Sequence, residues 1–590
     1  MRRHPLPKAF IVFLLLLAAP AYAWAKDSWM SVRSQNFTVV GNASEGDLRK
    51  MATKLEQFRY ALSLLFPSAR IATPVPTTII LFKDQHSFDP FKPKYKGKTK
   101  KQIAGYFRGG EDVNYIVLTK ELGASNPLEV IFHEYEHFVV HNNINNVPPW
   151  LDEGLAEFYS TFEPQSELKV RIGIPIRWHL MFLKSRDILP LKTLLNVDRK
   201  SPYYNESDKV GVFYAQSWAL VHYLMIGDRG KREGQLTRFI RQMNSGMSPE
   251  ENFKQSFQAD LKTIENELRA YISRFQFTVV DVTFKELDFV KDMQSAPLSE
   301  AEADYYLGDL QLHGNELKDA EELLQKSMAM DANLAKSRIS MSALRLRQNR
   351  SDEARKLAEE AIALDPKNYL GHLYYAEALS EAKKYEEAIK SYKEAALLKP
   401  EAWRIHVGLA RVYLGMGRDD EASRAFSAAL RQDPRNSYIN RVYSYTALRM
   451  ARGYLAAVNA KLYLQREGWR DEHSLYMVLA AHIGYRQSQR ADDAARILED
   501  AALKSDTSGW PYPVIEYLQR KLTADALLAL ATDNDKQTEA HAYIGMDLAL
   551  NGEREAALTH LRWVKENGNQ NFVEYPLALS EINRLEAQPR

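Results

Sequence analysis

Two histidines and a glutamate stand at a spacing that can hold a metal ion and activate water. The sequence reads His133-Glu134-Tyr135-Glu136-His137. On a helix, side chains four residues apart share a face, so the imidazoles of His133 and His137 would point the same way. Two neutral imidazoles one turn apart can bind the same zinc ion. Glu134 could then take a proton from zinc-bound water, so the pattern predicts a hydrolytic site with Glu134 as its base.

The surrounding residues favour a helix that could carry this pattern. Residues 126–140 place Pro127 near the start, Glu129 near the positive end and apolar residues along one face. In a chain of this length the five-residue pattern is expected by chance on the order of a few per cent of the time. A further ligand elsewhere in the sequence would therefore strengthen the prediction considerably.

A second predicted helix supplies that ligand. It follows a short polar loop and reads Trp150-Leu151-Asp152-Glu153-Gly154-Leu155-Ala156-Glu157. A catalytic zinc site uses three protein ligands and leaves its fourth position to water. Glu153 is the predicted third ligand. Glu157, one turn further along the same face, is predicted to accept a hydrogen bond from a ligand imidazole.

The two motifs together resemble those of a known family. H-E-x-x-H followed by W-L-x-E-G-x-A-E is similar to the gluzincin metallopeptidases, the relatives of thermolysin and aminopeptidase N. The resemblance implies that the glutamate at position 153 binds zinc. Fifteen residues separate His137 from Glu153, slightly fewer than is usual in the family, which implies a shorter loop between the helices. The resemblance also implies a zincin-like α+β fold, a Zn²⁺ cofactor and a protein or peptide substrate.

A segment further along the chain extends the resemblance. Residues 214–224 are similar to the Y-x-K-G-x-A-L-L-x-Y-L segment of the aminopeptidase N branch. The resemblance implies that Tyr214 donates a hydrogen bond to the oxyanion of a tetrahedral intermediate, which a phenol can do. Here Gln216-Ser217 replaces the Lys-Gly of the family. An aromatic residue of the core is the alternative for Tyr214. His222 could also face the site, but a helix histidine with satisfied hydrogen bonds is the simpler interpretation.

One element of that branch has no counterpart in this sequence. Its exopeptidases carry a G-x-M-E-N segment whose glutamate holds the free amine of the substrate. The nearest analogue by position is 110–118, whose second half is strand-like and could pair as an edge strand with an extended peptide. We therefore expect an endopeptidase rather than an enzyme that trims amino termini.

Alternative interpretations of the histidines remain open. The motif could be an ordinary helix with two hydrogen-bonded histidines, or a site that binds zinc without cleaving a substrate. His141 continues the series of His133 and His137 at four-residue steps. A ligand two turns away would have to reach back along a straight helix, and no glycine turns the chain between His137 and His141. His141 is therefore interpreted as a structural or rim residue.

Composition limits the class of protein. The chain has 590 residues, 45% hydrophobic and 26% charged, which is typical of soluble globular domains and too long for one core. A formal net charge of +2 argues against nucleic acid as a partner. The chain has no cysteine, so thiolate zinc ligands and disulfides are excluded.

The first residues have the pattern of a bacterial secretory signal peptide. Arg2 and Arg3 precede an apolar stretch at 10–19, and small residues follow at Ala21 and Ala23. We expect cleavage near residue 25 and a periplasmic or secreted mature chain. No later segment approaches twenty apolar residues, so no transmembrane anchor is expected.

The second half of the sequence repeats every 34 residues. The alanines and prolines in phase are Ala320, Ala354, Ala388 and Ala422, then Ala361, Ala395 and Ala429, then Pro366, Pro400 and Pro434. Aromatics at Tyr392 and Phe426 keep the same step, and Gly545, Ala557 and Leu561 restate the pattern near the end. This period is typical of tetratricopeptide repeats (TPR), which stack helix pairs into a superhelix with a concave groove. We expect the groove to bind a protein partner or substrate, with a rigid spacer or a cover over the catalytic cleft as the alternative.

These patterns predict an α+β zincin-like peptidase domain followed by an all-α TPR superhelix. Strands are predicted at 37–40, 77–82 and 115–118 and a helix at 45–65. The predicted boundaries are a signal peptide at 1–25, an N-terminal α/β sub-domain at 26–125, a helical zinc-binding sub-domain at 126–280, a linker at 281–300 and repeats at 301–587. The function expected is an exported zinc endopeptidase whose repeats recruit substrate or partner. The alternative is an inactive or weakly active TPR scaffold protein of the cell envelope.

Overall fold

The computed structural model describes residues 28–587 apart from short internal segments. The segments left out are 68, 70, 72–74, 96–97, 100–102, 122–126, 145, 199–200, 206, 244–246, 286–291 and 435. The predicted signal peptide, residues 1–25, lies outside the described residues. Among the described helices, none has both the length and the apolar character that a bilayer crossing requires.

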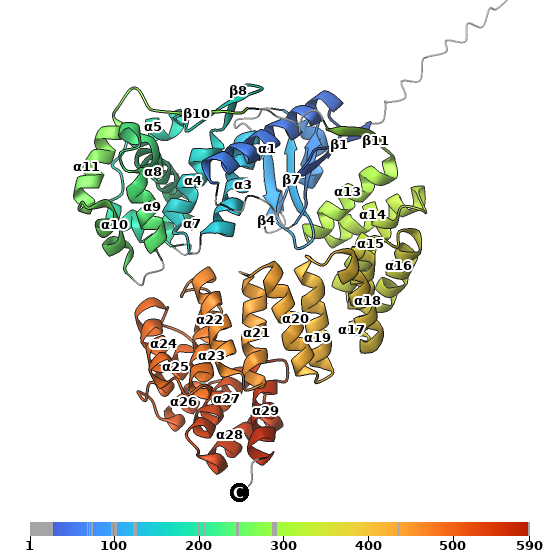
Figure 1. Ribbon diagram of the computed structural model, residues 1–590, viewed down its shortest axis with the longest axis vertical. Helices are drawn as coiled ribbons and strands as arrows, with labels where there is room; N and C mark the ends of the chain where they lie inside the picture. The colour runs from blue at the N-terminus through green and yellow to red at the C-terminus, as the bar shows by residue number, and fades with distance from the viewer. Residues whose placement is uncertain are drawn as a thin grey trace, which may run out of the picture.

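A six-stranded mixed sheet lies near the start of the chain (Figure 1). Its strands are β1 (Trp29–Arg33), β2 (Phe37–Gly41), β3 (Thr77–Phe82), β6 (Gly105–Arg108), β7 (Asn114–Thr119) and β11 (Gln294–Leu298). Their spatial order is β11-β1-β2-β3-β7-β6. β2, β3 and β7 run parallel, while the pairs β11/β1, β1/β2 and β7/β6 are antiparallel.

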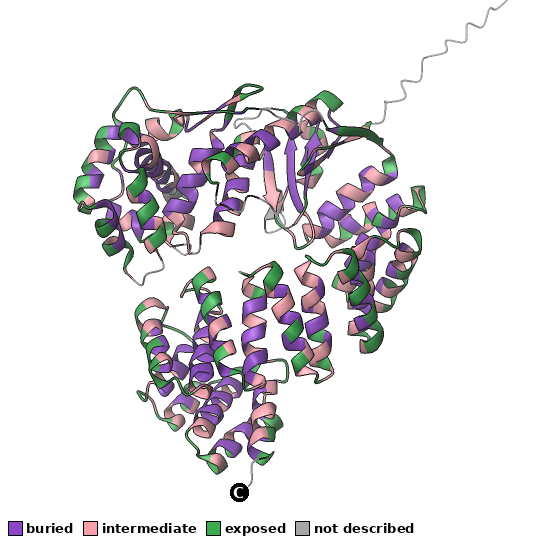
Figure 2. Cartoon of the chain, in the orientation of Figure 1, coloured by how far each residue is buried: buried purple, intermediate pink, exposed green. Residues whose placement is uncertain are grey.

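Both faces of the sheet are covered, and Figure 2 shows its central strands as almost wholly buried. On one face, Ile79 and Ile116 join a core with residues of α1 (Glu45–Leu65) and α3 (Pro127–Asn143). On the other face, Ile80 and Val117 pack with Leu310 of α13 (Glu300–His313), the first helix of the repeats. Burial on both faces explains why the central strands read as unbroken apolar runs.

The remaining elements before the repeats are mostly helical. They are α2 (Gln85–Phe88), β4 (Lys94–Tyr95), β5 (Lys98–Thr99), α4 (Pro149–Ser160), β8 (Glu163–Ser166), β9 (Lys169–Ile172), α5 (Arg177–Lys184), α6 (Leu191–Leu195), α7 (Pro202–Asn205), α8 (Ser207–Ile226), α9 (Glu233–Gln242), α10 (Pro249–Phe257), α11 (Leu261–Ile272) and β10 (Val280–Thr283), with short 3-10 helices at Asp89–Phe91 and Gly227–Arg229. α4 packs closely on α8 because Gly154 has no side chain. A Cβ atom there would lie 2.6 Å from the Ser217 carbonyl oxygen and 2.5 Å from Val221 Cγ2.

The strands and helix predicted in the N-terminal region are confirmed as β2, β3, β7 and α1. The prediction of an edge strand at 115–118 is wrong, because β7 lies between β3 and β6. The edge is β6, a four-residue strand that the sequence did not indicate.

The segment 281–300, predicted as a linker, carries more structure than a linker would. β10 pairs with β9, and β11 pairs along its whole length with β1. β11 contains Pro297, which cannot donate a ladder hydrogen bond and is tolerated because β11 is an edge strand. The chain therefore returns to the sheet before the repeats begin.

Helices α13 to α29 form the repeat domain. After α13 they are α14 (Leu317–Met330), α15 (Ala335–Arg347), α16 (Ser351–Leu364), α17 (Tyr369–Glu381), α18 (Tyr385–Leu398), α19 (Trp403–Gly415), α20 (Asp419–Gln432), α21 (Ser437–Arg449), α22 (Gly453–Glu467), α23 (Ser474–Gln487), α24 (Ala491–Lys504), α25 (Tyr512–Leu518), α26 (Ala524–Leu530), α27 (Asn534–Leu550), α28 (Arg554–Asn567) and α29 (Glu574–Ala587). Successive helices pack as antiparallel pairs, and the superhelix curves beneath the first half of the chain (Figure 1).

The residues that mark the 34-residue period have the roles that the period predicts. The in-phase alanines of both helices in each pair are fully buried: Ala320, Ala354, Ala388, Ala422, Ala361, Ala395 and Ala429. Each in-phase proline follows the end of a second helix by two residues, as Pro366 follows α16. The prediction of an all-α TPR superhelix after an α/β region is confirmed.

The repeats contact the first half of the chain through an acidic turn between β6 and β7, in which the side chain of Asp112 is mostly buried. Asp112 in this turn accepts hydrogen bonds from His313 Nε2 and from the Tyr374 hydroxyl, each at 2.8 Å. Arg404 Nε lies 3.2 Å from Glu111 of the same turn. His313, Tyr374 and Arg404 come from α13, α17 and α19, the first helices of three repeats. These first helices lie side by side, so the turn rests on one continuous face of the repeats.

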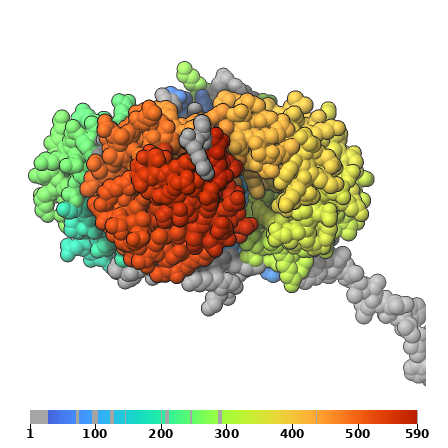
Figure 3. Space-filling model, turned by 90° about the horizontal axis from the view of Figure 1, so that it is seen from below, coloured from blue at the N-terminus to red at the C-terminus, as the bar shows by residue number. Residues whose placement is uncertain are grey.

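A second contact lies near the end of α3. Arg466 Nη1 of α22 donates a hydrogen bond of 2.8 Å to the carbonyl oxygen of His141. Arg470 Nη1, just beyond α22, lies 3.0 Å from a carboxylate oxygen of Asp198. The arc of repeats thus contacts the first half of the chain at two separated places, and Figure 3 shows a furrow between the first and the last repeats.

The first of these contacts is expected to weaken as pH rises. Burial alone would lower the pKa of His313, but the charge of Asp309 and the hydrogen bond to Asp112 raise it to about 9, from 6.5. A raised folded-state pKa stabilises the fold fully below pH 6.5, and that stabilisation is lost as pH rises through about 9. Between pH 6 and pH 10 the wild type should lose about 3 kcal/mol more unfolding free energy than His313→Gln.

Urea denaturation of both proteins at the two pH values measures this difference. Equal pH dependence in the wild type and in His313→Gln would show that the imidazolium does not hold the turn. His372→Gln, which removes a partly exposed histidine of α17, is the matched control.

Candidate functional site

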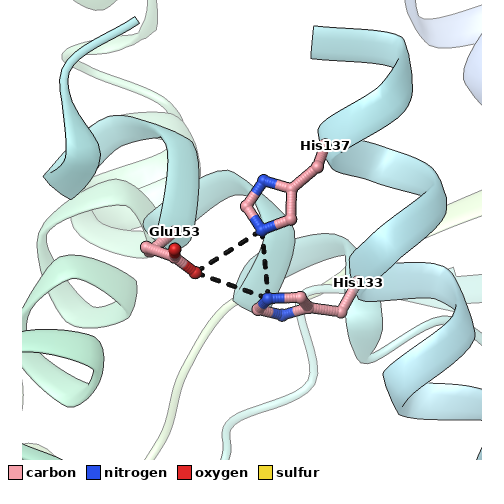
Figure 4. Close-up of side chains that lie close together, drawn as sticks. All are labelled: His133, His137 and Glu153. Atoms are coloured by element: carbon pink, nitrogen blue, oxygen red, sulfur yellow. Dashed lines mark hydrogen bonds and ion pairs between the residues drawn. The ribbon is translucent and has the colours of Figure 1, made fainter. Parts of the chain in front are cut away.

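Two helices bring the three predicted ligands together. His133 and His137 lie on α3 and Glu153 on α4 (Figure 4). The two Nε2 atoms are 3.2 Å apart. Glu153 Oε2 lies 3.4 Å from His133 Nε2 and 3.5 Å from His137 Nε2. All three groups therefore present one atom each to a common point.

The amphipathic pattern of α3 explains why the histidines face this point. Phe132 and Tyr135 are buried in the core against α1, which fixes the rotation of the helix. His133 and His137 then share the next face and remain partly exposed. Glu153 is buried, with only 3% of its surface exposed, and projects from α4 toward them.

The spacing of the three atoms fits a tetrahedral zinc ion. Ligand atoms about 2.1 Å from zinc in a tetrahedron lie about 3.4 Å from one another, close to the separations found here. Glu153 Oε2 is buried and has no hydrogen-bond partner. A buried carboxylate oxygen without a donor is costly, and a cation beside it would remove that cost.

The electrostatics of the site also favour a cation. Burial alone would raise the pKa of Glu153, but the imidazoles of His133 and then of His137, 3.4 Å and 3.5 Å from its Oε2, lower it well below its usual range. Burial would lower the pKa of His137, whereas the hydrogen bond to Asp152 and the neighbouring carboxylate of Glu153 raise it to about 11. Carboxylates that favour a positive charge on His137 would equally favour a metal ion bound to it.

Asp152 orients His137, a role that the sequence analysis did not assign. Asp152 Oδ1 lies 2.9 Å from His137 Nδ1, so the imidazole can keep Nε2 free for a ligand bond. The carboxylate of Asp152 also lies 2.9 Å from His141 Nε2. His141 is thereby held at the edge of the site, in agreement with its interpretation as a structural residue. Its place directly before Glu153 gave no signal for this contact, because adjacent residues of a helix project in different directions.

Glu157 does not have the contact that was predicted for it. Its Oε1 lies 3.9 Å from His133 Nδ1, too far for a hydrogen bond. Its Oε2 instead lies 3.3 Å from His179 Nε2 of α5. The prediction placed Glu157 on the correct face of α4 but paired it with the wrong histidine.

Two tyrosines lie beside Glu153. Tyr204 of α7 donates a hydrogen bond of 2.8 Å to Glu153 Oε1, and this contact was missed because a four-residue helix leaves no periodic signal. The ring of Tyr214 stacks against that of Tyr204 at 6.3 Å. Burial, and then the charge of Glu153, raise the pKa of Tyr214 above its usual value. Its phenol therefore keeps its proton and can donate a hydrogen bond.

His222 takes no part in the site. It is fully buried, with Nδ1 2.8 Å from the Tyr271 hydroxyl and Nε2 2.9 Å from the Gly173 carbonyl oxygen. The interpretation of His222 as a helix histidine with satisfied hydrogen bonds is confirmed.

A cleft of about 920 Å³ reaches His133, one of the candidate ligands. His133, Glu134 and Tyr214 line it together. α5 forms one wall, where Trp178 is 71% exposed. The predicted base and the predicted oxyanion donor therefore open onto the same space as the first histidine.

Comparison with known families identifies the parts of the chain. A family model described as the Peptidase MA superfamily matches residues 117–274, which contain α3, α4 and α8. Residues 117–274 form a Peptidase MA superfamily domain. Two tetratricopeptide repeat models match residues 343–403 and 379–444. A peptidase domain followed by tetratricopeptide repeats, as the sequence motifs suggested, is thereby confirmed.

Comparisons of the whole chain give less detail. A comparison with curated proteins gives no match. Among solved structures, pilF of Pseudomonas aeruginosa is 21% identical, with 38% of this chain and 98% of that chain covered and a TM-score of 0.31. PilW, described as a type IV pilus biogenesis factor, is 13% identical, with 36% and 94% covered and a TM-score of 0.31. YrrB, described as a TPR protein, is 14% identical, with 34% and 98% covered and a TM-score of 0.28.

Removing the Asp152 carboxylate is expected to weaken metal binding by the peptidase domain. In Asp152→Asn, His137 loses the charged partner of its Nδ1, so zinc affinity should fall about 10–100-fold. Competition with a chromophoric chelator measures the change. Glu157→Gln is the matched control, because its carboxylate is 3.9 Å from His133 Nδ1 and should matter less. Equal losses in the two variants would contradict the role given to Asp152.

Proposed function

We propose that this chain is an exported zinc-dependent endopeptidase whose repeats recruit a protein substrate or partner. One observation carries the proposal: Nε2 of His133, Nε2 of His137 and Oε2 of Glu153 surround one point, and Glu134 lines the cleft that reaches it. The match to the Peptidase MA superfamily supports the same chemistry.

Each of these residues has its own role in the proposed reaction. Zinc held by His133, His137 and Glu153 would supply a Lewis acid and lower the pKa of a bound water. The Glu134 carboxylate accepts the proton of the attacking water and returns it to the leaving amine nitrogen. The Tyr214 hydroxyl donates a hydrogen bond to the carbonyl oxygen as it gains negative charge.

Two features support cleavage within a substrate chain rather than at its amino terminus: the edge strand β6 and the lack of a motif that would hold a free amine. In the described part of the chain, β6 pairs only with β7, so an extended peptide could add to the sheet at its other edge. β6 also packs beside α3, which carries His133 and Glu134. No G-x-M-E-N segment occurs in the sequence to hold a free amino terminus.

Export and recruitment complete the proposal. The pattern of residues 1–25 supports delivery to a bacterial periplasm or to the medium. The repeats support recruitment because such helix pairs commonly present surfaces for protein partners.

Casein cleavage by the purified chain tests the proposed activity. Activity should disappear when the metal is stripped with 1,10-phenanthroline and return when Zn²⁺ is added. Tight zinc binding without metal-dependent cleavage of casein or of proteins from the host envelope would reject the endopeptidase. That result would favour the alternative, a scaffold protein of the envelope, whose complexes should survive Glu134→Gln.

A further inference from the structure

An apolar pocket of about 330 Å³ lies on another face of the metal-binding helix. Its walls come from the end of α1, from α3, from α4 and from α8 and α9. The buried side chains of Leu62, Val140, Leu155 and Leu236 line it. It shares no lining residue with the catalytic cleft. The volume is within the range of sites for small molecules.

One polar group interrupts the apolar walls. Glu136 lines the pocket and is 3% exposed. Its Oε2 atom is buried and has no hydrogen-bond partner. Among polar groups, a carboxyl oxygen is the one least suited to a dry apolar wall without a donor. The position of Glu136 therefore indicates that something other than the protein supplies a hydrogen bond there.

The rim of the pocket differs from its interior. Glu233, Thr237 and Arg241 recur every four residues on α9 and are exposed, while Leu236 of the same helix points inward. A molecule in the pocket would thus pass a polar rim, contact apolar walls and end at Glu136.

We propose that this pocket binds a small molecule with an apolar chain and a terminal hydroxyl group, and that the hydroxyl hydrogen-bonds to the carboxyl group of Glu136. The apolar walls of the pocket match the apolar chain of the small molecule. The hydroxyl fits the Glu136 carboxyl group because it can both donate and accept a hydrogen bond. Since α3 also carries His133 and His137, an occupant would contact the back of the helix that positions the metal ligands.

Binding of octan-1-ol to the full-length chain tests the proposal. Met225 lines the pocket, so its methyl group is a local reporter in a ¹³C-methyl-methionine NMR spectrum, assigned by Met225→Leu. We expect the Met225 signal to shift saturably with octan-1-ol. Glu136→Leu should weaken octan-1-ol binding about tenfold, the effect of one lost hydrogen bond. Heptyl methyl ether is an isomer of octan-1-ol without a hydrogen-bond donor. Glu136→Leu should lower its affinity by a smaller factor than it lowers that of octan-1-ol.

Two further variants make the outcome decisive. Leu236→Trp fills the pocket and should abolish the Met225 shift, while Thr237→Ala on the rim should leave it unchanged. Absence of a saturable shift in the wild type, or equal octan-1-ol affinity in the wild type, Glu136→Leu and Leu236→Trp, would overturn the proposal. Because the readout requires neither zinc nor peptide cleavage, its failure is independent of the proposed peptidase function.

Discussion

Replacing Glu134 with glutamine is expected to lower kcat/KM for casein about 10²–10⁴-fold, the usual contribution of a general base. Glutamine has the size of glutamate but cannot accept the proton of the attacking water. His133, His137 and Glu153 are untouched, so zinc content should stay at the wild-type level. Steady-state kinetics together with metal analysis measures both quantities on the same sample.

Glu129→Gln is the matched control for this variant. Glu129 lies five residues earlier on α3, and it also lines the cleft. The Glu129→Gln variant should cleave casein at the wild-type rate. If Glu134→Gln and the wild type cleave casein at the same metal-dependent rate, another group is the base and the mechanism proposed here is wrong.

Replacing Glu153 with alanine is expected to remove zinc from the protein. The two imidazoles of α3 would remain, but a site of two ligands lacks the third ligand atom, which Glu153 Oε2 provides in the wild type. The loss of affinity should exceed the roughly 10–100-fold expected for Asp152→Asn. Activity should fall with zinc content.

Thermal stability gives an independent readout of the same variant. Zinc at 100 times its Kd should stabilise the wild type by about 2.7 kcal/mol and leave Glu153→Ala unchanged. Glu163→Ala, which removes an exposed glutamate at the rim of the cleft, is the control. Zinc-dependent stabilisation of equal size in Glu153→Ala would place the metal elsewhere.

The histidine pair could be predicted because helical periodicity fixes which side chains share a face. His133 and His137 are one turn apart on a helix whose rotation is set by its apolar residues. Glu153 could be predicted from its motif. Asp152 could not, because adjacent residues of α4 project in different directions and only the packing of α4 on α3 shows which of them reaches His137.

Some strands of the sheet could also be predicted from the sequence, and others could not. β3 and β7 could be predicted because continuous apolar runs are typical of strands buried on both faces. β6 has four residues, and β11 contains a proline, so local preference gives little signal for either. Both are edge strands, and their pairing depends on a neighbour distant in sequence, as for β11 and β1.

The acidic turn between β6 and β7 has a consequence for any partner of the repeats. It lies on the inner helices of the first repeats, with Asp112 and Glu111 against His313, Tyr374 and Arg404. Because the turn is covalently attached, it competes there as a tethered ligand at an effective concentration of at least about millimolar. A soluble peptide of modest affinity could not displace it. The inner helices further along the arc are also in contact with the chain itself, because α29 packs on α21 and α27 packs on α23. A partner of the repeats therefore meets inner helices that the chain's own segments already contact in the first repeats and in the later ones.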